Sequence, residues 1–195
     1  MNIQRTIASS LISASLLTIG APSFADWTIN NEQSAIHFSS VKKNTIGEVH
    51  RFDQISGSLK KDGSFTAEIA LASVNTGIEI RDTRMQEHLF ETAKFPSANI
   101  TAALPSELMK SLKKGASLTE SVTFTLDLHG KKVELTGNVV VNVSKKAIQV
   151  NTVAPIMLDA AAFDLVPGIE MLKKLAGLDA IATAVPVTLH LVLEK

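Results

Sequence analysis

Apolar and polar side chains alternate along most of the second half of the chain. Apolar residues occupy every second position in 121–128, and the same period returns in 132–143, 148–152 and 185–193. A period of two is typical of a strand with one dry face and one wet face. Parallel strands would read as continuous apolar runs joined by long helical crossovers, so we expect antiparallel strands linked by short turns.

The first half of the chain adds shorter strands. They are predicted at 27–29, 35–41, 52–59, 65–71 and 98–103. The total of about eight or nine strands suits an all-β barrel, because a closed barrel leaves no unpaired sheet edge. A β-sandwich remains the alternative, since periodicity alone does not separate the two architectures.

Three short helical excursions are predicted between the strands, near 82–92, 106–114 and 168–182. Asp82 is expected to cap the first of them. In the second, Glu107 in the first turn suits the helix dipole. The third has a wide apolar face and is expected to cover one barrel end, either as a lid that moves for a ligand or as a fixed plug.

The first 25 residues have the pattern of a secretory signal peptide. One basic residue, Arg5, precedes an uncharged run from Thr6 to Ala21, and small residues surround the expected cleavage site after Ala25. We therefore expect export to the periplasm and a single mature domain, residues 26–195.

Composition and charge exclude several classes of partner. The chain has no cysteine, which excludes disulfides and a lipidated N-terminal cysteine, so no stable membrane anchor is expected. Cleavage after Ala25 removes one basic residue and leaves 19 − 1 = 18 basic residues against 19 acidic ones, a net charge of −1. A broad positive field is therefore missing, and no nucleic-acid partner is predicted.

Local signatures of catalysis and metal binding are missing from the sequence. None of the five histidines has a partner at metal-ligand spacing, and neither a Gly-x-Ser-x-Gly elbow nor a glycine-rich phosphate loop occurs. His88 and Glu91 share one helical face, but a solvated pair is the simpler interpretation. We predict no catalytic residue, no metal and no cofactor, and hence a binding protein rather than an enzyme.

The most diagnostic segment is 73–96. It contains, in order, Ser73-Val74-Asn75-Thr76, Arg81-Asp82, Met85, Leu89-Phe90 and Phe95-Pro96. This order resembles the YceI-like family of lipid and polyisoprenoid-binding proteins, and a weaker likeness extends over nearly the whole mature chain. The resemblance implies a lipocalin-like antiparallel β-barrel with an elongated interior cavity, and it leaves a homodimer open as the oligomeric state.

The predicted ligand-binding residues lie on or beside the first helical excursion. They are Arg81, Arg84, Met85, His88, Leu89, Phe90 and Phe95. Arginine forks suit a diphosphate or carboxylate head group, and the apolar members would line or close the cavity. The alternative for Arg81 is a structural pair with Glu79 or Asp82. The family pattern is not kept at Lys42-Lys43, at 47–57 or at Ala161, so no ligand contact is carried over to those places.

The sequence predicts a periplasmic binding or carrier protein for a long-chain isoprenoid or similar apolar lipid. Two alternatives stay open. One is an enzyme that acts on an isoprenoid-like substrate through Arg81, His88 and a carboxylate, and the other is a stress or interaction protein whose barrel is packed solid. Small residues at candidate inward positions are compatible with an open interior as well as with close packing. These residues are Ala35, Ala67, Ala70, Ala72, Ala98, Ala102 and Ala103.

Overall fold

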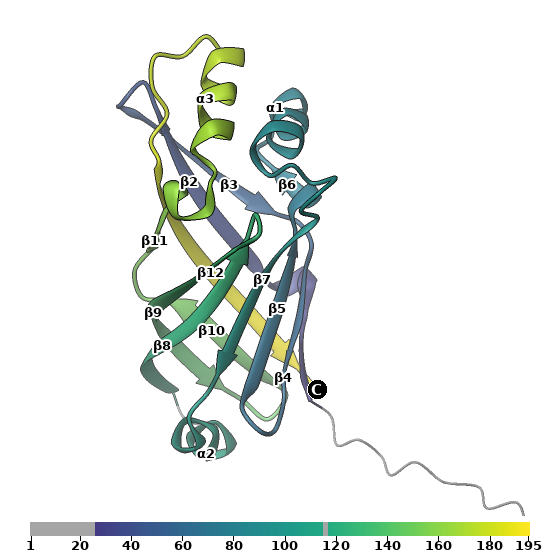
Figure 1. Cartoon of the computed structure of the whole chain (residues 1–195). Helices are drawn as coiled ribbons and strands as arrows, with labels where there is room; N and C mark the ends of the chain where they lie inside the picture. The colour runs from purple at the N-terminus through teal and green to yellow at the C-terminus, as the bar shows by residue number, and fades with distance from the viewer. Residues whose placement is uncertain (1–25, 115–116) are drawn as a thin grey trace, which may run out of the picture.

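The computed structural model describes residues 26–114 and 117–195 (Figure 1). The predicted signal peptide, residues 1–25, lies outside the described residues. One sheet holds the 12 strands of the described part. The strands are β1 (Trp27–Ile29), β2 (Ala35–Lys42), β3 (Ile46–Phe52), β4 (Ile55–Leu59), β5 (Ser64–Ala70), β6 (Val74–Asn75), β7 (Ser97–Ala103), β8 (Ser117–Leu128), β9 (Lys131–Val143), β10 (Ala147–Thr152), β11 (Ile156–Asp159) and β12 (Ala184–Glu194).

Eight of the described strands close into a ring in the order β1-β4-β5-β7-β8-β9-β10-β12, because β1 also pairs with β12. Trp27 lies opposite Leu59 of β4, and Ile29 lies opposite Leu193 of β12. Every pairing in the ring is antiparallel. The predicted lipocalin-like antiparallel barrel is therefore confirmed, and the sandwich alternative is wrong.

The sheet that forms the barrel wall divides where a short 3₁₀ turn, η1 (Asn31–Gln33), separates β1 from β2. β1 pairs with β4, whereas β2 pairs with β3. Ala35–Phe38 of β2 also pair with Val187–His190 of β12. The β2–β3 hairpin thus extends the wall toward the end of the barrel that carries α1 and α3, which is the upper end in Figure 1.

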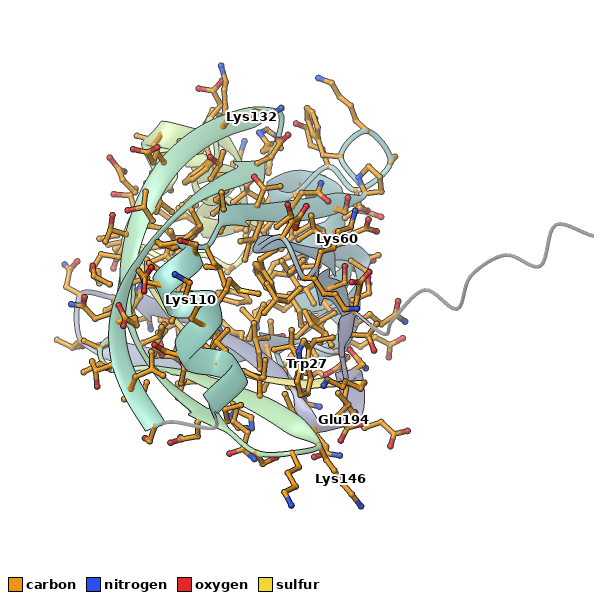
Figure 2. The ribbon with its side chains drawn as sticks, turned by 90° about the horizontal axis from the view of Figure 1, so that it is seen from below. Trp27, Lys60, Lys110, Lys132, Lys146 and Glu194 are labelled. Atoms are coloured by element: carbon orange, nitrogen blue, oxygen red, sulfur yellow. The ribbon has the colours of Figure 1, made fainter. Side chains whose placement is uncertain are left out.

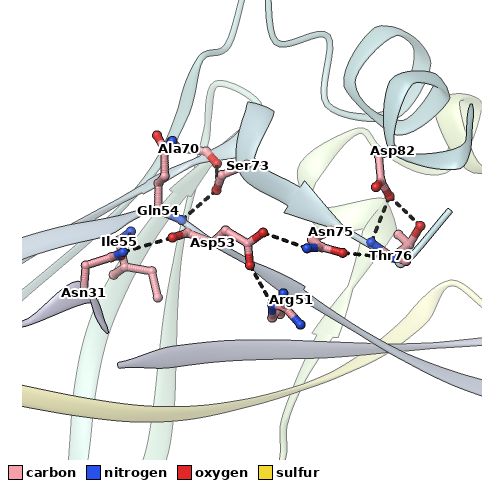
Figure 3. A network of polar contacts seen from close by, with 11 residues as sticks. Asn31, Arg51, Asp53, Gln54, Ile55, Ala70, Ser73, Asn75, Thr76 and Asp82 are labelled. Atoms are coloured by element: carbon pink, nitrogen blue, oxygen red, sulfur yellow. Dashed lines mark hydrogen bonds and ion pairs between the residues drawn. The ribbon is translucent and has the colours of Figure 1, made fainter. Parts of the chain in front are cut away.

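Polar side chains satisfy the backbone where the ladder is broken between β3 and β4 (Figure 3). Asn31 accepts a hydrogen bond from the Ile55 N–H at 2.6 Å and donates to the Asp53 carbonyl at 3.0 Å. The Asp53 carboxylate accepts from Arg51 Nε at 2.6 Å and from Asn75 Nδ2 at 2.7 Å. The two Asn31 contacts replace ladder hydrogen bonds at the split, since backbone polar groups need partners, and the Asp53 carboxylate joins side chains of β3 and β6.

The same network continues to the first helix, α1 (Glu79–Arg84). The Asp82 carboxylate accepts hydrogen bonds from the Thr76 N–H, at 2.8 Å, and from the Thr76 hydroxyl (Figure 3). Asp82 is therefore not the helix cap that the sequence predicts, because the helix begins three residues earlier with Ile78 in the cap position. Its carboxylate reaches back from within the helix and ties α1 to the end of β6.

The other helical segments surround the two ends of the barrel. They are η2 (Leu71–Ser73), the π-helix η3 (Met85–Leu89), α2 (Ser106–Lys114), η4 (Ala160–Phe163) and α3 (Val166–Leu175). None of the described helices combines the length and apolar composition needed to cross a membrane.

Several predicted boundaries need correction. The first excursion spans 79–89 rather than 82–92, and the third spans 166–175 rather than 168–182, whereas 106–114 is confirmed. The third helix ends early because Gly177 takes a positive φ of 61°. The predicted strand 52–59 is two strands, separated at Asp53 by the network described above, and β11 was not predicted, since its four residues are too few for a periodic signal.

Candidate functional site

The barrel encloses two adjoining chambers, with volumes of about 110 and 150 Å³. We call the smaller one, beside α2, the lower chamber, and the larger one, beside η3 and α3, the upper chamber. Their described lining residues are all aliphatic, aromatic or glycine. A cavity without polar side chains offers water few hydrogen-bond partners and suits an apolar molecule.

Helix α2 closes the lower chamber. Leu108 and Leu112, four residues apart, share one helical face and line the chamber, where both are buried. Figure 2 views this end directly, with α2 lying across the opening and Lys110 on its outer side. An amphipathic helix therefore seals the barrel by burying one apolar face.

The upper chamber is covered by η3, η4 and α3. Ile169 of α3 and Phe163 of η4 are buried and line this chamber. A Cβ on Gly168 would lie 2.5 Å from the His88 carbonyl oxygen and 2.8 Å from Leu89 Cα, so only glycine lets α3 approach η3 this closely. The third helix covers a barrel end, as expected; its motion as a lid stays a prediction.

Small side chains leave part of the interior open. Ala98 and Ala102 line the upper and lower chambers, and Ala67 shares the inward face of Phe65 and Ile69. Neither chamber is lined by Ala67 or by the other alanines proposed from the sequence, Ala35, Ala70, Ala72 and Ala103. A solidly packed barrel does not describe this interior.

A group of polar side chains continues the inward face of β2 and β3 beyond the upper chamber. Phe38 and Phe52 line the chamber. His50 lies opposite Phe38, and Glu48 lies opposite Ser40. Directly opposed residues in an antiparallel pair point to the same face. The inner wall therefore changes from apolar to polar toward the tip of the β2–β3 hairpin.

We call Ser40, Lys42, Glu48, His50 and Arg81 the polar cluster. His50 is 4% exposed, its Nε2 lies 2.9 Å from the Ser40 hydroxyl, and its ring centroid lies 5.2 Å from that of Phe38. Glu48 contacts Lys42 Nζ at 2.9 Å and Arg81 Nη1 at 3.0 Å. His50 is thus buried, whereas the side chains of Lys42, Glu48 and Arg81 are half-buried and paired with one another.

Two buried nitrogens of the polar cluster have no hydrogen-bond partner among the described residues. They are Nδ1 of His50 and Nε of Arg81. Arg81 already donates from Nη1 to Glu48 and from Nη2 to the Thr76 carbonyl, at 2.7 Å. The Nε–H remains a fixed donor, and a buried donor without a partner costs about 1–3 kcal/mol. This position is suited to a ligand atom that accepts a hydrogen bond.

Burial and neighbouring charges determine the protonation of the polar cluster. Burial lowers the pKa of His50, and the positive charge of Arg81 lowers it further, against the opposing effect of Glu48 and Asp82. The hydrogen bond from Lys42 holds the pKa of Glu48 below its usual value. At neutral pH the histidine is therefore uncharged and the glutamate is ionised.

The residues predicted from the sequence occupy different environments. Leu89 and Phe90 line the upper chamber, and Phe90 also packs against Phe52, with 5.7 Å between ring centroids. Met85 is buried in the core but does not line either chamber, and Arg81 joins the polar cluster.

Three predicted residues lie away from the chambers. Arg84 donates from Nη1 to the Leu175 carbonyl at 3.3 Å and so connects α1 with the end of α3. His88 is exposed and lies 3.7 Å from Glu87. Phe95 packs against the His129 ring, with 4.4 Å between centroids, and is not a lining residue. The described residues contain no group of acidic and histidine side chains arranged for a metal.

Sequence reasoning missed His50, Glu48 and Ser40. Residues 46–52 were not predicted as a strand, although Ile46, Glu48, His50 and Phe52 alternate with outward positions. The inward set of this strand is mixed in polarity, so the usual contrast between a dry and a wet face is absent. The signal that could have revealed this strand is its position next to the alternating residues 35–41, with which it can pair as a hairpin.

We predict that lowering the pH from 7 to 5 reduces the free energy of unfolding through His50. The pKa of His50 lies below its ordinary value of 6.5, so in this window the unfolded chain binds the proton more readily than the folded protein. The contribution is complete above pH 6.5 and is lost as the pH falls, by at most about 1.4 kcal/mol per pH unit. Urea denaturation should show a shallower pH slope for His50→Gln.

The matched control is His88→Gln, because His88 is exposed at the end of η3. It should keep the wild-type slope. The carboxylates with lowered pKa lose their contributions below about pH 4.5, outside the window. They are Glu48, Asp53, Asp62 and Asp164. Equal slopes for His50→Gln and the wild type would contradict the assignment.

Comparisons with known proteins agree with this architecture. A polyisoprenoid binding domain from Saccharophagus degradans, implicated in plant cell wall breakdown, is 36% identical, covers 87% of this chain and 98% of its own, and superposes with a TM-score of 0.82. BcnA from Burkholderia cenocepacia is 18% identical (84% and 98% covered, TM-score 0.66). A YceI protein from Campylobacter jejuni is 13% identical (75% and 84% covered, TM-score 0.54). The last two show the fold alone.

A comparison with curated proteins finds no significant match. The model of the YceI-like domain family matches residues 27–193, nearly the whole described chain. This match confirms the resemblance carried by the segment 73–96. The chain belongs to the YceI-like domain family.

Proposed function

We propose that the protein binds one long apolar lipid, with the chain in the two chambers and the head group at the polar cluster, and carries it in the periplasm. The observation that supports this most strongly is the continuity of the inner wall. Two chambers lined by described apolar residues lead to a polar cluster with buried, unused hydrogen-bonding capacity. An amphiphilic lipid likewise has an apolar chain that ends in a polar head group.

Burial of the chain supplies the affinity in this proposal. Apolar surface removed from water contributes about 25 cal/mol per Å², before the cost of immobilising the ligand. Aromatic and aliphatic side chains such as Phe124 and Leu126 provide this contact without directional demands. The chambers would therefore select for an apolar chain, and the polar cluster for the head.

A neutral head group fits the polar cluster better than a diphosphate. Lys42 and Arg81 carry two positive charges, and Glu48 and Asp82 balance them with two negative ones. A multiply charged anion would enter this site without a matching excess of positive charge, which is costly. The Arg81 Nε–H needs an acceptor, and a quinone carbonyl or a hydroxyl oxygen supplies one.

Two further parts of the proposal, the isoprenoid class of the ligand and the periplasmic location, are supported by one relative and by the signal-peptide pattern. The Saccharophagus degradans domain, 36% identical, is described as polyisoprenoid binding, and transfer of that ligand class to this chain is part of the proposal. The signal-peptide pattern of residues 1–25 supports export to the periplasm. We propose binding rather than catalysis, because the described lining residues of both chambers carry no nucleophile or acid–base group.

Filling the upper chamber should weaken lipid binding. We predict that Ala98→Phe weakens the binding of a long polyprenol or prenyl quinone by about tenfold or more, because the new ring occupies space that the chain needs. Isothermal titration of lipid-free protein measures the loss, and thermal unfolding checks that the fold survives.

The matched control is Ala103→Phe on the same strand, where the side chain is exposed and lies outside both chambers. It should bind lipid as the wild type does. A folded Ala98→Phe variant with wild-type affinity would show that the ligand lies elsewhere.

The head-group assignment makes a separate prediction. Arg81→Lys keeps the positive charge but removes the Nε donor, and a hydrogen bond from a charged group is worth about 1.5–3 kcal/mol. We expect affinity for a neutral prenyl lipid to fall about tenfold. Affinity for squalene, an isoprenoid without a head group, should not change.

Arg84→Lys is the control, since Arg84 contacts the Leu175 carbonyl rather than the polar cluster. It should leave both ligands unaffected. An equal loss for squalene and the prenyl lipid in Arg81→Lys, or tighter binding of a prenyl diphosphate than of the matching alcohol, would contradict the head-group assignment.

A further inference from the structure

The two chambers meet at a boundary formed by side chains from four strands. Four described residues line both chambers: Ile100 of β7, Phe124 of β8, Ile156 of β11 and Leu189 of β12. We call these four residues the neck. A chain whose head lies at the polar cluster must pass the neck before its far end reaches the lower chamber.

Gly137 of β9 leaves the space into which the neck side chains fit. A Cβ at this position would lie 2.7 Å from Ile156 Cδ1, 3.2 Å from Ile156 Cγ1 and 3.8 Å from Phe124 Cε1. The backbone of Gly137 does not have a positive φ, so its conformation does not demand glycine. The requirement is steric, and it involves two of the four neck residues.

The position of Gly137 in its strand is also unusual. The inward residues of β9 near it, Val139 and Val141, are branched aliphatic side chains that line the lower chamber. Gly137 lines the same chamber one step closer to the neck, opposite Val122 of β8. The row of large inward residues is therefore interrupted at the level where the two chambers meet.

The lower chamber ends beyond the neck at α2. Leu104, Leu108 and Leu112 close it on the side away from the polar cluster. A chain that passes the neck thus enters a space of limited depth, about 110 Å³ in volume. The upper chamber alone, at about 150 Å³, is open to shorter chains.

We infer that Gly137 and Ile156 determine the length of the chain that the protein accepts. Short prenyl chains occupy the upper chamber only, and longer chains gain affinity by extending through the neck into the lower chamber. This inference rests on the proposed function, because it takes the head group to lie at the polar cluster. Gly137 and Ile156 thus set the accepted chain length although neither belongs to the polar cluster.

The test compares chain lengths in lipid-free protein. Geraniol, farnesol, geranylgeraniol and a longer polyprenol share one head group and differ in the number of isoprene units. For the wild type, affinity should rise by about tenfold per added unit until the lower chamber is full. Titration calorimetry gives the affinities.

Trp27 provides an independent readout of the lower chamber. It is the only tryptophan of the chain, and it lies opposite Leu59, which lines the lower chamber. Its fluorescence should change only with chains long enough to pass the neck.

Closing the neck should remove the gain from length. For Gly137→Val we expect an affinity for geraniol within about twofold of the wild-type value and an affinity for the longest chain that is about tenfold or more lower. The fluorescence of Trp27 should not change with any chain. Ile156→Phe closes the neck from the opposite side and serves if Gly137→Val does not fold. Combining Gly137→Val with Ile156→Ala should restore long-chain binding, because the smaller residue vacates the space that valine takes.

Gly47→Val is the matched control, because Gly47 is also a strand glycine and a Cβ added to it would have no atom within 4 Å. It should leave all affinities unchanged. Equal losses for short and long chains in the folded neck variants, or no loss at all, would overturn the neck inference while wild-type binding still supports the proposed function. A wild-type protein that binds none of the alcohols would overturn the proposed function itself.

Discussion

The closure of the barrel through β1 is the constraint on which the other features depend. Only three residues long, β1 pairs with β4 on one side and with β12 on the other, so the ring has no free edge between them. Where the ladder is interrupted, the Asn31 side chain accepts a hydrogen bond from the Ile55 N–H and donates one to the Asp53 carbonyl. Unpaired buried backbone groups would cost about 1–3 kcal/mol each. Because the wall satisfies its own hydrogen bonds, the interior has no need of polar side chains.

An interior of this kind is costly to keep empty. Cavities in protein cores cost about 24 cal/mol per Å³, so chambers of about 110 and 150 Å³ cost several kcal/mol when nothing fills them. A ligand that occupies them returns contact energy and stabilises the folded state by mass action. The Arg81 Nε–H, which has no partner among the described residues, also favours a ligand with a hydrogen-bond acceptor at the upper end. Cavity and polar cluster thus favour the same kind of occupant, an apolar chain with one acceptor-bearing head.

Local patterns predicted what depends on local periodicity. The alternation of Val122, Phe124, Leu126 and Leu128 identified the inward face of a wall strand, and it coincides with lining residues of the chambers. The helix at 106–114 was found because its charge pattern, with Glu107 in the first turn, lies within its own sequence. Leu89 and Phe90, which the family segment proposed as ligand-binding residues, line the upper chamber, and their contact with a ligand stays a prediction.

Features that depend on strand register escaped prediction. His50 and Glu48 face inward only because residues 46–52 pair with 35–42, and nothing local identifies that register. Phe95 was placed at the ligand by its neighbours in sequence, yet it packs on the His129 ring of the β8–β9 turn, which is distant in sequence. Gly137 resembles any glycine in a strand until Ile156 of β11 is brought against it. The candidate site is therefore assembled by topology more than by motif.

The most direct test is mass spectrometry of the chloroform-extractable material that accompanies the protein when it is purified from its native host without detergent. We expect one prenyl lipid per protein molecule, with a neutral, oxygen-bearing head group. An empty protein that also fails to take up prenyl quinones and polyprenols in solution would contradict it.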